Sequence, residues 1–74
     1  MDLVNLNELI LHYENIIEYE DRFSTNEIQS NYDLIKTHIE TLKSRGDKDL
    51  YVQALQVCEE GLDRILATRR TPTP

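Results

Sequence analysis

With 74 residues, the chain is long enough for one small domain and no more. Its formal net charge of −6 and its pI of about 4.7 disfavour binding to nucleic acids and to anionic membrane surfaces. Its single cysteine forms no internal disulfide and none of its apolar runs exceeds three residues, so we expect a cytoplasmic protein with no signal peptide and no transmembrane helix.

The first predicted helix covers about residues 3–22. Apolar residues recur there in alternating steps of three and four, which is typical of an amphipathic helix and unlike the alternation of a strand. This stripe consists of Leu3, Leu6, Ile10, Tyr13 and Ile17. Residues 1–23 also carry six acidic side chains and one basic side chain, a net charge of −5, so most of the acidity of the chain lies in this segment.

The second predicted helix covers residues 25–45 and has the clearest start signal in the chain. Ser24 at the N-cap position and Glu27 three residues later form a capping box. Gly46 can adopt the left-handed conformation that ends a helix. The apolar stripe between these signals is narrow and consists of Ile28, Tyr32, Ile35, Ile39 and Leu42.

The third predicted helix covers about residues 48–68 and has the broadest apolar face. That face consists of Leu50, Tyr51, Ala54, Leu55, Val57, Cys58, Gly61, Leu62, Ile65 and Leu66. The small residues Ala54 and Gly61 on one edge predict the close approach of another helix. A basic cluster near the carboxyl end, which should favour the helix dipole, consists of Arg64, Arg69 and Arg70. Residues 71–74 are expected to be a flexible Thr/Pro tail.

These elements predict an all-α fold with a single helical domain over residues 1–70. Both connections between helices are short, so consecutive helices should run antiparallel. The expected architecture is a three-helix antiparallel up-down-up bundle, or an extended helical hairpin, with coiled-coil-like packing. We expect Tyr13, Tyr32 and Tyr51 to lie in the core with their hydroxyls reaching water or a carbonyl at its edge.

The sequence contains no recognisable catalytic or metal-binding motif. Cys58 lies in the middle of an apolar helix face, where a thiol is expected to have a raised pKa and little reactivity. Neither His12 nor His38 belongs to a catalytic motif. Glu8 and His12 share a helix face, but two ligands do not make a metal site. We therefore expect a protein that is not an enzyme and that needs no cofactor or metal.

The first helix carries apolar residues on two opposite sides. Val4 and Leu11 are seven residues apart and lie opposite its main stripe, so one packing surface cannot bury both sets. On the same side, towards the end of the helix, the side chains become charged at Glu14, Glu18 and Asp21. This arrangement resembles the apolar centre and polar rim of a protein interface, although exposed apolar residues are also common on folded proteins that have none there.

Tyr19 points away from the main stripe and is expected to be exposed. Single exposed aromatic side chains are common on protein surfaces, but they also anchor interfaces. We therefore include Tyr19 with Val4, Leu11 and the three acidic residues among the candidate partner-binding residues.

The start of the third helix, Asp47–Tyr51 in a short acidic helical chain, is loosely similar to the small co-chaperones of type III secretion needle subunits. The likeness covers about the last third of the chain. Proteins of that family are not catalytic and act by packing helices against a partner. The resemblance implies the same general mode of action here.

The leading hypothesis is a non-catalytic protein–protein interaction module, of a small adaptor or co-chaperone type, that binds a partner or itself through its first helix. The assembly would be a homodimer or a hetero-complex. The alternative is a small acidic inhibitor, phage- or plasmid-borne, that uses the acidic side of the first helix to block a basic groove of a host enzyme. The two hypotheses differ in whether apolar contacts or charges supply most of the binding energy.

Overall fold

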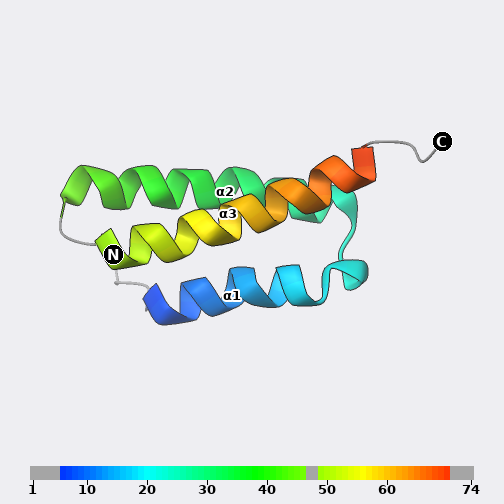
Figure 1. The fold of residues 1–74 in the computed structure, drawn as a ribbon, viewed down its shortest axis with the longest axis horizontal. Helices are drawn as coiled ribbons and strands as arrows, with labels where there is room; N and C mark the ends of the chain where they lie inside the picture. Colours follow the sequence, from blue (N-terminus) through cyan, green and yellow to red (C-terminus); the bar gives the residue numbers. More distant parts are fainter. Residues whose placement is uncertain (1–5, 47–48, 71–74) are drawn as a thin grey trace.

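The computed structural model describes residues 6–46 and 49–70, and these form an all-α bundle. Their elements are α1 (Leu6–Glu18), the short 3₁₀ turn η1 (Glu20–Arg22), α2 (Thr25–Arg45) and α3 (Asp49–Arg70). The helices run up, down and up along a body of 45 × 19 × 18 Å (Figure 1). The predicted antiparallel three-helix bundle is confirmed. The predicted beginning of the first helix and the predicted tail lie outside the described residues.

The first helix is shorter than predicted. Its α-helical hydrogen bonding ends when the Tyr19 amide donates to the Asn15 carbonyl, and the chain continues as η1 rather than as α-helix to residue 22. Negative charge is unfavourable at a helix carboxyl end, and α1 ends at Glu18 with no basic residue in its last turn. The change of helix type at Tyr19 places Glu20 in a new first turn, where a carboxylate is favourable.

The second helix has the boundaries that the sequence predicts. The Ser24 hydroxyl accepts from the Glu27 amide at 3.1 Å, and the Glu27 carboxylate accepts from the Ser24 amide at 2.8 Å, so both halves of the capping box are present. At the other end Gly46 has φ 78° and donates its amide to the Leu42 carbonyl. Glycine adopts this left-handed conformation without a Cβ clash, which fixes the end of α2.

The third helix continues two residues beyond its predicted end, to Arg70. Two residues assigned to its buried face are in fact on the surface, since Leu50 is 79% exposed and Val57 is 69% exposed. Val52, which the predicted face omitted, is buried instead. The face that α3 buries is therefore turned towards Val52 and away from Leu50 and Val57.

The core lies between all three helices because α3 packs against both α1 and α2. Fully buried side chains come from each helix, and they include Tyr13, Ile16, Ile28, Ile35, Leu55, Leu62 and Leu66. Burying an aliphatic side chain of this size contributes about 1.5–3 kcal/mol relative to leaving it exposed. In a chain this short, loss of any one of these contacts is a large part of the stability.

Gly61 lets α1 and α3 approach each other closely, as its place on the edge of the apolar face predicts. A Cβ atom added at Gly61 would lie 2.9 Å from Cδ1 of Ile17, which is closer than carbon atoms normally pack. The absence of a side chain at this position thus makes room for Ile17 of α1. The seam between the two helices depends on that space.

Arg69 holds the connection between α1 and α2 against the end of α3. Its guanidinium donates to the carbonyl of Glu20 at 2.7 Å and to the carbonyl of Phe23 at 3.0 Å, and it lies 3.6 Å from the Glu20 carboxylate. Neighbouring Arg70 donates to the Gln29 side chain on α2. The arginines expected to favour the helix dipole thus also make specific contacts with the rest of the bundle.

Candidate functional site

A groove of about 380 Å³ runs along the surface between α1 and α3. We call it the α1/α3 groove. It is lined by Glu14, Ile17 and Glu18 of α1 and by Val57, Cys58, Glu60, Gly61 and Arg64 of α3. The contact of Ile17 with Gly61 brings the two helices together there. The groove is the best-supported candidate for a binding site in the described part of the chain because it combines exposed Val57 and half-buried Ile17 with charged side chains from both helices.

One exposed apolar side chain lines the α1/α3 groove, and two others are exposed on the same helices outside its lining. Val57 lines it directly, and Leu50 lies two turns earlier on the same side of α3. On α1, Leu11 is 54% exposed and lies two turns before Glu18, which also lines the groove. Val57 thus adds an exposed apolar side chain to the groove, whereas Leu11 lies opposite the buried stripe of α1 and outside the lining of the groove.

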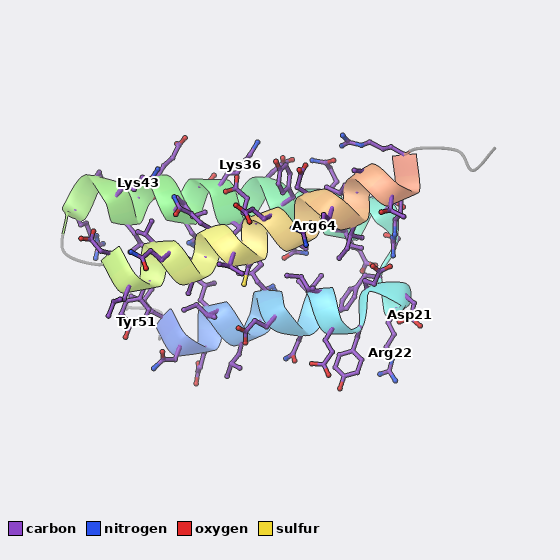
Figure 2. All side chains as sticks on the ribbon, in the orientation of Figure 1. Asp21, Arg22, Lys36, Lys43, Tyr51 and Arg64 are labelled. Carbon is purple, nitrogen blue, oxygen red and sulfur yellow. The ribbon has the colours of Figure 1, made fainter. Side chains whose placement is uncertain are left out.

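Acidic residues outnumber basic residues in the lining of the groove. Three carboxylates, those of Glu14, Glu18 and Glu60, accompany one guanidinium, that of Arg64, and give a net charge of −2. None of the four forms an ion pair with another described residue. Figure 2 shows that the side chain of Lys36 extends from α2 on the side away from α1.

The structure brings only some of the predicted partner-binding residues together. Leu11, Glu14 and Glu18 lie on one side of α1, at steps of three and four residues. Tyr19 is exposed, as predicted, but it follows the last residue of α1, and its ring lies against Arg22 at 5.1 Å from the guanidinium carbon. Asp21 is exposed in η1 and so is not on α1. Val4 lies outside the described residues.

The half of the groove that α3 contributes was not predicted from the sequence. Leu50 and Val57 were expected in the core, and Glu60 had no predicted role. A signal was present: Leu50, Val57 and Arg64 are spaced by seven residues, so they share one flank of the helix, and the third of them is charged. A flank that ends in arginine is more typical of a surface than of a core.

His12 belongs to the opposite side of α1, where a smaller groove of about 280 Å³ faces α2. Its Nε2 atom is hydrogen-bonded to Oδ1 of Asn31 at 3.1 Å. The Asn31 amide nitrogen donates to the Glu27 carbonyl at 2.8 Å, which leaves Oδ1 to accept from the imidazole. In the described part of the chain no three His, Cys, Asp or Glu side chains come close enough to hold a metal ion.

Tyr13 and Cys58 are buried together in the core. Burial, and then the neighbouring Cys58, raise the pKa of Tyr13 from 10.0 to about 12. Burial, and then the charge of Glu14, raise the pKa of the Cys58 thiol, as the sequence predicts for a thiol in the core. A thiol in this state is a poor nucleophile because the reactive form is the thiolate.

The expectation that the Tyr13 hydroxyl reaches water or a carbonyl is wrong. The side chain is fully buried, and its hydroxyl has no hydrogen-bond partner among the described residues. The ring packs edge-on against the His12 and His38 rings, with centroid distances of 5.1 Å and 6.3 Å. These contacts position the ring in the core without supplying a polar partner for its hydroxyl.

Replacing Tyr13 with phenylalanine should therefore stabilise the fold by about 1 kcal/mol at neutral pH, since an unpaired buried hydroxyl carries a desolvation penalty. The advantage of the variant should grow from pH 10 to pH 12. In that window the unfolded tyrosine ionises while the folded one stays protonated, so the wild type loses stability as the pH rises. Urea denaturation across this range measures both effects, and a Tyr13→Phe variant that is destabilised at pH 7 would contradict the first.

Comparisons with protein-family models, with curated proteins and with solved structures find no match to this chain. Of the helices that the structure describes, none combines the length and the apolar character needed to cross a membrane.

Proposed function

We propose that the protein is a non-catalytic protein–protein interaction module that binds a partner protein through α1 and the adjoining edge of α3. The observation that carries the proposal is the groove between α1 and α3, in which exposed Val57 lies among charged side chains, while Leu11 on α1 and Leu50 on α3 are exposed outside its lining. An apolar centre with a charged rim is the usual composition of a protein interface. Cys58, the single cysteine, is buried and unpaired, which suits the cytoplasmic location that we also propose.

Replacing Leu11 with glutamate should weaken partner binding at least about tenfold, because a charge at the centre of an apolar contact loses its hydration on binding. The helicity measured by circular dichroism should not change, since Leu11 is exposed and contributes little to the core. The measurement is capture of partner proteins from the host by immobilised protein, with quantification by mass spectrometry.

Leu34→Glu is the matched control for this experiment. Leu34 is exposed on α2 and 47% accessible, so the same substitution is made away from the groove. Partners lost by the Leu11 variant and retained by the Leu34 variant support the proposal. Equal capture by wild type and both variants would show that α1 is not the binding surface.

A second candidate function is the acidic inhibitor that blocks a basic groove of an enzyme. Its support is the exposed carboxylates of Glu14, Glu18 and Asp21 together with the net charge of −5 on residues 1–23. Ionic strength distinguishes the two functions. Binding that depends on these carboxylates should weaken strongly as salt is raised, whereas binding through Leu11 and Val57 should change little.

The oligomeric state is tested by the thermal midpoint of unfolding. In a homodimer the midpoint rises with protein concentration by mass action. Two copies of the α1/α3 groove carry the same net negative charge, so we favour a hetero-complex and expect a midpoint that stays constant over two decades of concentration. A rising midpoint together with a dimer mass in sedimentation would show that the predicted homodimer is the correct assembly.

A further inference from the structure

We infer that the ligand of the α1/α3 groove is a basic amphipathic helix of the partner protein, which packs along α1 and α3 as a fourth helix of the bundle. This inference rests on the proposed function and adds the chemistry of the partner. Two observations support it: the helical spacing of the residues that line the groove and the uneven charge of the groove.

The spacing along the groove suits a helix. Val57, Gly61 and Arg64 line the groove from α3 at steps of four and three residues, and Glu14 and Glu18 line it from α1 four residues apart. These steps follow the helical period, so each helix presents a row of side chains to the groove along its axis. A helix lying lengthwise contacts its neighbours at such positions, as in helix-in-groove recognition and in helical bundles. Because α1 and α3 run in the same direction (Figure 1), one straight helix can contact both along their shared length.

The charge of the groove favours basic residues on both flanks of the partner helix. Glu14 and Glu18 line the α1 side, and Glu60 lines the α3 side against Arg64 alone. Lysine or arginine on both sides of an apolar stripe would meet carboxylates on both sides of the groove, whereas acidic flanks would be repelled. A second copy of this chain is a poor occupant for the same reason, since its own groove and the first segment of its chain are acidic.

The test uses two synthetic helical peptides of three heptads, about 21 residues, that share one leucine stripe and differ only in their flanks. One carries lysine and arginine at the flanking positions, and the other carries glutamate. Fluorescence anisotropy measures the binding of each labelled peptide to the full chain at low and at moderate salt. We expect the basic peptide to bind at least about tenfold more tightly than the acidic one.

Two matched double variants remove the same charge from different places. Glu14→Gln with Glu60→Gln removes one carboxylate from each side of the groove and should weaken the basic peptide about threefold or more. Asp33→Asn with Glu40→Gln removes two exposed carboxylates from α2 and should leave binding unchanged. Val57→Glu, placed in the groove itself, should abolish binding of the basic peptide, and circular dichroism checks that each variant stays folded.

The possible failures separate this inference from the proposed function. Equal binding of both peptides, lost in Val57→Glu, would overturn the basic partner and leave the groove as a binding surface. No binding of either peptide would overturn the helical ligand, while the capture experiment with Leu11→Glu still tests the function on its own. A dimer in sedimentation that Val57→Glu converts to monomer would replace the basic helix by a second copy of the chain.

Discussion

Replacing Arg69 with alanine is expected to lower the free energy of unfolding by about 3 kcal/mol, since each hydrogen bond to a charged group contributes roughly 1.5–3 kcal/mol. The guanidinium donates to two carbonyls, those of Glu20 and Phe23, and its side chain is 21% exposed. Truncation leaves both carbonyls without this donor at the junction of η1 and α2. Chemical denaturation of the two proteins measures the loss.

Two further variants separate the geometry of Arg69 from its charge. Arg69→Lys keeps the positive charge but has a single ammonium in place of the planar fork that reaches Glu20 and Phe23 together, so it should recover less than half of the lost stability. Arg70→Ala removes the same side chain from the next position, where the guanidinium donates to half-buried Gln29 in a solvent-exposed hydrogen bond, and should cost under about 1 kcal/mol. Equal losses at the two positions would contradict the role given to Arg69.

The helix boundaries that the sequence predicted best are those set by local chemistry. Ser24 and Glu27 are three residues apart and satisfy each other without help from the rest of the chain. The end of α2 likewise depends on the conformation of one glycine, Gly46. The residues that make up such signals lie within about one helical turn of each other, so they can be recognised in the sequence before the packing of the helices is known.

The features that the sequence did not predict depend on residues distant along the chain. The contacts of Arg69 with Glu20 and Phe23 span more than forty positions, and nothing near Arg69 indicates which carbonyls it reaches. The unpaired hydroxyl of Tyr13 is a similar case, because whether a tyrosine finds a partner depends on three helices at once. Hydrophobic spacing alone carries no information about such contacts.

The sequence predicted the residues that α1 contributes to the candidate site but not those that α3 contributes, because the latter depend on packing between helices. On α1, Leu11 lies opposite the buried stripe, and the helical period alone places it on the surface. On α3 the apolar residues cover so much of the circumference that the helical period does not decide which of them face the core. The direction was decided by packing: α1 contacts the edge that contains Gly61, and Val57 is left outside that contact. The groove could therefore be identified only once the position of α1 against α3 was known.

Replacing Gly61 with leucine is expected to cause the second large loss of stability, because this glycine lets α1 and α3 pack closely at the groove. A Cβ atom at this position already meets Cδ1 of Ile17 at 2.9 Å, and the remaining atoms of leucine would occupy the space of the Ile17 side chain. Overpacking of this kind costs about 1–3 kcal/mol. Moving α1 outward instead would expose Ile16, whose burial contributes about 1.5–3 kcal/mol.

We therefore expect Gly61→Leu to lose about 2–3 kcal/mol of unfolding free energy, because overpacking and outward movement of α1 carry similar costs. Gly61→Ala is the control that separates sterics from helix propensity. Alanine is about 1 kcal/mol more favourable than glycine in a helix interior, and the single clash is with the flexible end of Ile17, so this variant should change stability by less than about 1 kcal/mol. Chemical denaturation monitored by circular dichroism gives both values. A Gly61→Leu variant as stable as Gly61→Ala would mean that α1 and α3 do not depend on their close approach, and that the floor of the groove is not fixed by Ile17.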